Sequence, residues 1–370
     1  MKDDKDNTEP TFNEIYNWIE DNSTYVETDK DGNTTSKIDV VCHEFIKALI
    51  RIEQFVAEVL STDDPAFVMR ERLIERNDIR KVQIHLDRLP LARHFTAVIK
   101  LFQNYSVDYK YSPHVELFFQ CCIKLELASE WFSNPLANTS KPKKQYELFN
   151  ELLKLIRTEA REAEFKGQIN DREDKANRNF KSAVEFVTSL FVRRLLVLRV
   201  DFSYIPEYAN NISAEEAKAD LAHFLFNFRH NKKMSEHLEG YIWKWEFTPL
   251  KKMHCHLLFF YNGAYVQDDA YWGNLIGAYW KDVITHGRGM FYNGNTKQNK
   301  ARFEELGILG IGMIDPIDDD PEKDKGKAKR DILINTIVKY FLKSSQYLIA
   351  TKLENSKGRI FGKGYGPNWK

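Results

Sequence analysis

The spacing of apolar residues changes along the chain, and the change predicts two differently built regions. In the first region, Phe45–Leu60 and His114–Phe132 carry apolar residues at intervals of three and four, which is typical of amphipathic helices. Strand signals are sparse there. We therefore expect residues 1–132 to form an all-helical N-terminal domain of unknown role.

The middle of the chain predicts a connection between the two regions. Ser133–Gln145 is rich in polar and turn-forming residues, which favours a linker. Tyr146–Asn177 is charged and helix-prone, and it is expected to be a connecting helix or an oligomer-forming arm. Residues 133–190 are accordingly assigned to a linker and a charged connecting helix.

From residue 191 the pattern becomes one of alternating strands and helices. Arg194–Tyr204 is rich in β-formers, Ser213 is a plausible N-cap for a helix that ends near Lys232, and Tyr241–Thr248 with Met253–Tyr261 predicts a hairpin. Further elements are expected at Asp269–Thr285 (helix), Gly307–Asp315 (strand) and Asp331–Ala350 (amphipathic helix). This order, β-α-β-β-α-β-α, predicts an α+β domain at 191–370 with an antiparallel sheet backed by helices.

The second strand of the hairpin carries two histidines on one face. His254 and His256 are two residues apart, so they point to the same side of the strand, whereas Cys255 points to the other. Folding the hairpin about Leu250 places Glu246 opposite one of the two histidines. Opposite residues of an antiparallel pair share a face, with β-carbons about 5 Å apart.

Two imidazoles and a carboxylate on one face are a set of metal ligands. Two nitrogens and one carboxylate with open positions suit Mg²⁺ or Mn²⁺ engaged with a phosphate, and tolerate Zn²⁺. The alternative is that His254 and His256 are two hydrogen-bonded core histidines. Glu246 opposite them favours the metal site.

A second group of side chains lies on the predicted helix near the C-terminus. Tyr340, Lys343 and Tyr347 are spaced at i, i+3 and i+7, which places them on one stripe. Taken alone, the stripe is typical of a lysine that extends between two packed tyrosines. Beside a metal site, a tyrosine oxygen could attack a phosphorus atom, and the ammonium could stabilise the developing charge.

These residues carry a family resemblance. "MHCHLLFF" resembles the His-hydrophobic-His strand of HUH endonucleases, and "YFLK" resembles their Tyr-x-x-Lys helix motif. More closely, "RVDFSY", "HCHLLFFYNG", "IGAYWKDVITHGRGMFYN", "LGIGMID", "KYFLKSSQYL" and "RIFGKGYG" are similar to the YagK/YfjJ C-terminal domain of inovirus (filamentous phage) gene II-type replication initiators. The similarity spans about Arg194 to Pro367. No family is recognised for the first 180 residues.

The resemblance implies an HUH or ferredoxin-like fold and a rolling-circle replication initiator. In such enzymes a tyrosine attacks a DNA phosphodiester, forms a 5′-phosphotyrosine link and frees a 3′-OH. Carried over, Tyr340 is the nucleophile, His254 and His256 are metal ligands and Lys343 stabilises charge, while Glu246 as third ligand rests on the hairpin geometry. Tyr347 is either a second nucleophile or a packing or DNA-stacking residue.

The expected partner is single-stranded or supercoiled origin DNA, with a host helicase and a single-strand-binding protein as further candidates. Three other readings stay open: a non-catalytic DNA-binding regulator of a prophage, a hydrolytic metallo-nuclease, and an HUH relaxase or transposase. Formation of a covalent protein–DNA adduct separates the first two from a tyrosine enzyme. The oligomeric state is open.

Weaker candidates surround this site. Asp201, on the strand beside the hairpin, could support the metal from behind or simply end the strand. Arg288, Arg359 and Lys363 are candidate DNA contacts in Gly-rich, basic stretches. Ordinary turns and a flexible end explain those stretches equally well.

Composition is compatible with this interpretation. The 54 basic and 54 acidic side chains cancel, but the excess of basic residues lies in the C-terminal half, which is compatible with a phosphate-bearing partner. The four cysteines suggest no disulfide framework. We expect no signal segment and no membrane span, and hence a protein of the bacterial cytoplasm.

Overall fold

The computed structural model describes residues 24–28, 34–38, 40–76, 79–248, 250–343, 348–350 and 356–367. They form two compact units, an N-terminal unit (His43–Arg172) and a sheet unit (Glu173 onward, with the described residues before His43). As predicted, the chain combines helices with antiparallel sheet, and the N-terminal half is mainly helical. Within the described residues no helix is long and apolar enough to cross a membrane.

Helices packed on aromatic side chains form the body of the N-terminal unit. Phe149 lies at the centre, with ring centroids 6.4 Å from Phe55, 6.1 Å from Phe67 and 5.5 Å from Phe95. All four rings are buried, so a shared aromatic core holds this body together. The elements are α2 (Val40–Leu60), a 3₁₀ turn η1 (Pro90–His94), α3 (Val98–Phe102), β5 (Tyr109–Tyr111), α4 (Pro113–Lys124), a second 3₁₀ turn η2 (Leu127–Ser129) and α5 (Gln145–Ala160).

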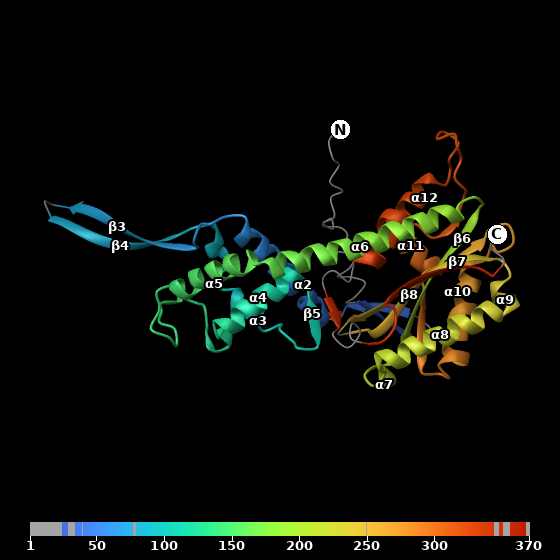
Figure 1. The fold of residues 1–370 in the computed structure, drawn as a ribbon, viewed down its shortest axis with the longest axis horizontal. Coiled ribbons are helices and arrows are strands. Elements are labelled where there is room, and N and C mark those ends of the chain that lie inside the picture. Colours follow the sequence, from blue (N-terminus) through green and yellow to red (C-terminus); the bar gives the residue numbers. More distant parts are fainter. Residues whose placement is uncertain are drawn as a thin grey trace. The chain divides into compact units, whose positions relative to one another are not determined.

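The all-helical prediction is wrong between Phe67 and Arg88. β3 (Phe67–Arg76) and β4 (Ile79–Arg88) pair as an antiparallel ribbon that extends away from the helices of its unit (Figure 1). Several β-branched residues favour strands here. The spacing of the Arg and Glu residues suits a helix equally well, and for that reason the strands were not predicted. A further hairpin, β1 (Thr24–Thr28) with β2 (Thr34–Ile38), precedes α2.

The boundary between the units also differs from the prediction. Ser133–Gln145 is an ordered loop of the N-terminal unit, because the buried side chain of Gln145 accepts hydrogen bonds from the backbone of Ser133 (3.0 Å) and Asn134 (3.1 Å). The charged stretch that follows is two helices, α5 and α6 (Ala163–Leu190), instead of one. The boundary at Glu173 falls within α6.

An antiparallel sheet forms the second unit. Its strands are β6 (Leu195–Tyr204), β7 (Leu238–Thr248), β8 (Lys252–Asn262), β9 (Gly289–Asn293), β10 (Gly312–Ile314) and β12 (Phe361–Tyr365). They are ordered β10-β6-β8-β7-β12, with β9 also paired to β6. The predicted β7–β8 hairpin is confirmed. β9 and β12 were not predicted, because their glycines disguise short strands as turns and a flexible end.

Helices cover both faces of this sheet (Figure 1). One face packs on α6 and on the helix made of α12 (Lys327–Ile332), the π-helical turn η4 (Leu333–Val338) and α13 (Lys339–Lys343). The other packs on α8 (Ala214–His230), α10 (Asp269–Ala278) and the π-helical turn η3 (Tyr279–Ile284), where Phe202 stacks on Trp280 at 4.6 Å. The remaining short helices are α7 (Pro206–Ala209), α9 (Lys232–Ser235) and α11 (Lys297–Glu305).

The prediction of one helix from Asp331 to Ala350 is corrected at its end. The described helix ends at Lys343, and Leu348–Ala350 is a short strand, β11. Ser344 and Ser345 are weak helix formers and interrupt the amphipathic pattern in the sequence. The predicted N-cap of α8 is confirmed, since Ser213 accepts a hydrogen bond from the backbone of Glu216 at 3.1 Å.

Candidate metal centre and its surroundings

The β7–β8 hairpin brings together the three side chains that the sequence singles out. The register pairs Glu246 with His254, as the hairpin geometry predicts, and His256 lies two residues further along the same face. The three are buried, with 7, 2 and 1% of their surfaces exposed. We call Glu246, His254 and His256 the histidine cluster.

Donor atoms of the histidine cluster converge on one point. One ligand atom from each of the three residues lies within 4.8 Å of the other two. Oε2 of Glu246 is 3.8 Å from Nε2 of His254 and 3.4 Å from Nε2 of His256. The two imidazole rings are almost perpendicular, at 89°, so their nitrogens approach from different directions.

The other nitrogen of each histidine lies beside an oxygen atom. Nδ1 of His254 lies 3.0 Å from the carbonyl oxygen of Lys252, to which it can donate. Nδ1 of His256 lies 3.0 Å from Oδ1 of Asp201, its register partner on β6. Partners of this kind fix the tautomer of a metal-binding histidine and leave Nε2 for the metal. Asp201 therefore lies next to Nδ1 of His256, on the side away from Glu246. This is the supporting position that the sequence suggested for its carboxylate.

Two buried cations neutralise the two carboxylates. Arg199 pairs with Asp201 (Nη2 to Oδ2, 3.1 Å), and its guanidinium also lies over the ring of Phe341. Lys244 pairs with Glu246 (Nζ to Oε1, 3.2 Å) from the position opposite His256. Because Lys244 engages Oε1, the other oxygen of Glu246 is the one directed at the histidines.

Burial and charge set the protonation of the cluster. Burial, aided by the neighbouring His256, lowers the pKa of His254 to about 3, so this imidazole is neutral. Burial opposes a charge on His256 as well, but Asp201 and Glu246 outweigh it and raise its pKa to about 9. Lys244 and the histidines hold the pKa of the Glu246 carboxyl well below its usual range in spite of burial. The position between the carboxylates of Asp201 and Glu246, which the His256 ring occupies, therefore favours a positive charge.

A divalent cation fits this arrangement. Within the described part of the chain, Nε2 of His254 and both ring nitrogens of His256 are buried without a hydrogen-bond partner, and of these only Nδ1 of His256 lies close to Asp201. A buried polar atom without a partner costs about 1–3 kcal/mol, and a metal ion bound to Nε2 of each histidine would remove that cost. Two imidazole nitrogens and one carboxylate oxygen form a donor set that leaves coordination positions open.

Tyr340 lies beside the histidine cluster. Its ring is partly buried on α13, 6.2 Å from the His256 ring between centroids, and it packs at the edge of the apolar core of the sheet. Phe341 fills the space on the other side, 5.1 Å from the same imidazole. Lys343 ends α13, and its side chain is outside the described part of the structure. Tyr347 also lies outside the described residues.

The candidate DNA contacts of the sheet unit lie apart from the cluster or are already engaged. Arg288 immediately precedes β9 and pairs with Asp220 of α8 at 3.2 Å. Lys363, on β12, donates to the hydroxyl of Ser182 on α6 at 2.7 Å and lies over the Phe186 ring. Arg359 is exposed. These positions are compatible with surface contacts, but none of the three completes the histidine cluster.

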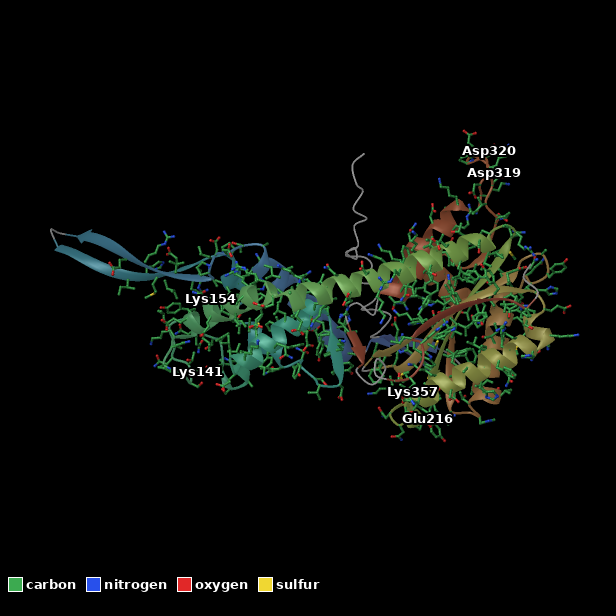
Figure 2. The ribbon with its side chains drawn as sticks, viewed as in Figure 1. Lys141, Lys154, Glu216, Asp319, Asp320 and Lys357 are labelled. Carbon is green, nitrogen blue, oxygen red and sulfur yellow. The ribbon has the colours of Figure 1, made fainter. Side chains whose placement is uncertain are left out.

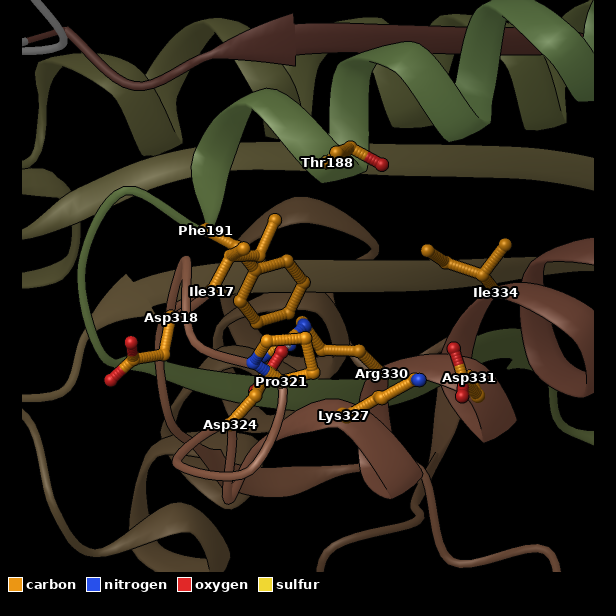
Figure 3. A pocket seen from close by; sticks show the side chains of 10 residues that line it. All are labelled: Thr188, Phe191, Ile317, Asp318, Pro321, Asp324, Lys327, Arg330, Asp331 and Ile334. Atoms are coloured by element: carbon orange, nitrogen blue, oxygen red, sulfur yellow. Dashed lines mark hydrogen bonds and ion pairs between the residues drawn. The ribbon is translucent and has the colours of Figure 1, made fainter.

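A cavity of about 310 Å³ lies elsewhere in the sheet unit, against α6 and α12 (Figure 3). None of its lining residues belongs to the histidine cluster. Arg330 lines the cavity and donates hydrogen bonds to the carbonyl oxygens of Asp315 (2.8 Å) and Pro316 (2.9 Å). These bonds anchor the acidic loop that precedes α12. Asp319 of that loop is exposed and points outward into solvent (Figure 2).

Sequence reasoning missed Arg199 and Lys244. Each precedes a carboxylate by two residues on a strand whose other side chains are largely apolar or aromatic, as in "RVD" and "KWE". Opposite charges at i and i+2 share a face, so this pattern was available as a sign of buried ion pairs. To interpret this pattern as a buried ion pair, one must know that the strand face is buried, and periodicity alone does not establish that.

Comparisons with known proteins do not name a relative. No family model, no curated protein and no solved structure matches this chain.

Proposed function

We propose that the protein is a metal-dependent, site-specific DNA nicking and joining enzyme that initiates rolling-circle replication through a 5′-phosphotyrosine intermediate. The observation that carries the proposal is the histidine cluster with Tyr340 packed beside it, because a nucleophile next to a cation site is what phosphodiester transfer requires. The resemblance of the surrounding motifs to HUH initiators supports the same choice.

Glu246, His254 and His256 would hold the cation, with Mg²⁺ or Mn²⁺ favoured for work on a phosphate. When bound, the cation would polarise the scissile phosphate and offset its developing negative charge. Arg199 and Lys244 already neutralise the two buried carboxylates, so a cation added to this group leaves an excess of positive charge. That excess favours an anionic phosphodiester over a neutral ligand.

The reaction is a transesterification in which bonds and protons balance. The phenol oxygen of Tyr340 attacks the phosphorus and gives up its proton. A tyrosine–phosphorus bond forms, the bond from phosphorus to the 3′ oxygen breaks, and the leaving oxygen takes up a proton to become the 3′-OH. Rejoining is the reverse attack by a 3′-OH, so the phosphodiester energy is kept in the covalent link.

Lys343 would stabilise charge near the phenolate, and Asp201 would hold the orientation of His256. Tyr340 is partly exposed while the cluster is buried, so we assign the DNA approach to the side of Tyr340. The buried surroundings of the cluster strengthen its electrostatic effect on a phosphate.

The test uses the full-length chain, Mn²⁺ and a pool of random-sequence single-stranded oligonucleotides labelled at either end. The proposal predicts that 3′-labelled DNA becomes attached to the protein, while 5′-labelled fragments are released with 3′ ends that a polymerase can extend. Cleavage that leaves both labels free of protein would instead show a hydrolytic metallo-nuclease. Binding with no cleavage of any DNA in the pool or of supercoiled plasmid would show a DNA-binding regulator.

A further inference from the structure

The end of α8, the short helix α9 and the turn after β8 are joined into one surface of the sheet unit. Asn231 ends α8 and begins α9, so the two helices are continuous along the chain. The hydroxyl of Tyr261 donates to the carbonyl oxygen of Met234 at 2.7 Å, and the backbone of Asn262 donates to the carbonyl oxygen of His237 at 2.9 Å. Side chains that these segments expose therefore lie on a common, hydrogen-bonded backbone.

Two aromatic rings are exposed on this surface. Phe226 of α8 is 64% exposed, and Tyr265 of the turn is 69% exposed. Each ring has an imidazole beside it: His237 stacks on Tyr265 at 4.5 Å with 10° between the planes, and His230 lies 4.6 Å from Phe226. The parallel imidazole covers one face of the Tyr265 ring and holds the ring in place, so the exposed surface is available to a further flat group.

Positive charge accompanies the two rings. Arg229, Lys232 and Lys233 are exposed, and within the described residues no ion pair engages them. The only acidic residue of the sequence between positions 226 and 237 is Glu236. We call the following residues the aromatic–basic patch: Phe226, Arg229, Lys232, Lys233, His237 and Tyr265.

The aromatic–basic patch is separate from the histidine cluster. α8 packs Phe228 on Phe259 of β8, with 5.2 Å between ring centroids. Phe259 and His256 are an odd number of residues apart on β8, so they point to opposite faces of the sheet. From His256 to the end of β8 at Asn262 the strand extends about 20 Å. A ligand of the patch therefore does not occupy the metal position.

We propose that the aromatic–basic patch binds single-stranded DNA. Bases stack on Tyr265 and Phe226, and the phosphates lie against the exposed cations. Surfaces for single strands combine these two features, because every base has a flat face and every nucleotide has a charged phosphate. The inference deepens the proposed function and rests on it for the choice of DNA, since it gives the strand that continues beyond the nicking site a place to bind.

A lipid surface fits the patch less well. A helix that lies on a membrane presents a broad apolar face to it. Between residues 213 and 266, the exposed large apolar side chains are Phe226 and Tyr265. Two isolated rings suit the stacking of single bases better than insertion into a bilayer.

The test measures binding of a fluorescein-labelled oligothymidylate of about 20 residues to the full-length chain by fluorescence anisotropy. EDTA is present, so that metal-dependent cleavage does not interfere. Tyr265→Ala and Phe226→Ala are each expected to weaken binding about 5- to 150-fold, the effect of losing one base–aromatic stack. Tyr265→Trp keeps a stacking ring and should retain the affinity. Tyr208→Ala is the matched control, since Tyr208 is 45% exposed on α7, outside the patch.

The cations are tested by the salt dependence of the same binding. Lys232→Gln with Lys233→Gln is compared with Lys297→Gln with Lys325→Gln, two exposed lysines elsewhere in the sheet unit. Loss of two phosphate contacts on a single strand lowers the slope of log affinity against log salt by about 1.4. That loss is expected for the patch pair, and a change well below it for the control pair. Circular dichroism confirms that all variants are folded.

Wild-type affinity in both Tyr265→Ala and Phe226→Ala overturns the proposal, and so does a wild type that binds no single strand. Phosphatidylserine vesicles and an oligouridylate are tested in parallel. Tighter binding of either, with the same loss in Tyr265→Ala, would assign the patch to a membrane or to RNA and overturn the proposal.

Covalent adduct formation with Mn²⁺ is assayed separately. Binding that depends on the patch but is followed by no adduct would contradict the proposed function alone. An adduct formed while the variants keep wild-type affinity would contradict this inference alone.

Discussion

Replacing Glu246 with glutamine removes one negative charge from the histidine cluster and keeps the shape of the side chain. Nζ of Lys244 lies 3.2 Å from Oε1 of Glu246, and both residues are buried. Removing one partner of a buried ion pair costs about 3–5 kcal/mol, and the lower end applies here because the glutamine oxygen still accepts from the lysine. The metal-free variant is therefore expected to lose about 3 kcal/mol of stability.

A second and more specific effect concerns the response to metal. A ligand at 100 times its dissociation constant stabilises the folded state by about 2.7 kcal/mol, and this gain disappears if binding is lost. We expect the urea midpoint of the wild-type sheet unit to rise with Mn²⁺ and that of Glu246→Gln to stay constant. Mn²⁺ paramagnetic resonance measures the bound fraction independently.

Glu239→Gln is the matched control. Glu239 lies on the same strand, is 6% exposed and pairs with Arg193, outside the histidine cluster. Because the side chain of Arg193 is 43% exposed, water can replace its partner, and the loss of stability should be smaller. This variant should keep the full response to Mn²⁺. A wild-type response in Glu246→Gln would refute the assignment of the cluster as a cation site.

Four further variants have expected outcomes. Asp201→Asn weakens the hold on His256 and should lower Mn²⁺ affinity about 10–100-fold in paramagnetic-resonance titrations; unchanged affinity would separate Asp201 from the metal site. Gly277→Ala should destabilise the sheet unit by about 1–3 kcal/mol in urea unfolding, because its new methyl would meet the Phe291 ring at 2.0 Å. Gly167→Ala, in α6, has nothing within 4 Å of its new methyl and should stabilise by about 0.5–1 kcal/mol; equal effects of the two glycine changes would contradict this packing. Asn295→Ala should cost about 1–3 kcal/mol in the same assay, because the buried side chain joins the backbone of Arg199 (2.8 Å) and Val197 (2.9 Å); a neutral change would show that water replaces it.

The hairpin and its three candidate ligands could be predicted from the sequence because they depend on local geometry. Strand alternation fixes the common face of His254 and His256, and a short turn fixes the register that brings Glu246 opposite. Both steps need only nearby residues. The structure confirms that Glu246 lies opposite one of the histidines, His254, and it shows in addition that all three side chains are buried.

Features that depend on distant residues could not be predicted in the same way. Arg199 and Lys244 lie on a sheet face that α6 and the η4–α13 helix cover. Their burial, and hence their role as buried ion-pair partners, can be recognised only when the fold is known. β9 and β12 become strands because β6 and β7 offer edges to pair with, which overrides their glycines. The prediction failed at the β3–β4 ribbon for a different reason: its charges fit a helix face as well as a strand face.

Mapping the DNA-linked residue tests the central claim most directly. After reaction with Mn²⁺ and the oligonucleotide pool, the protein is digested with nuclease and trypsin, and the peptide that carries a nucleotide is sequenced by mass spectrometry. We predict the nucleotide on Tyr340, and no adduct in Tyr340→Phe. An adduct on another residue, or one that persists in Tyr340→Phe, would contradict the account.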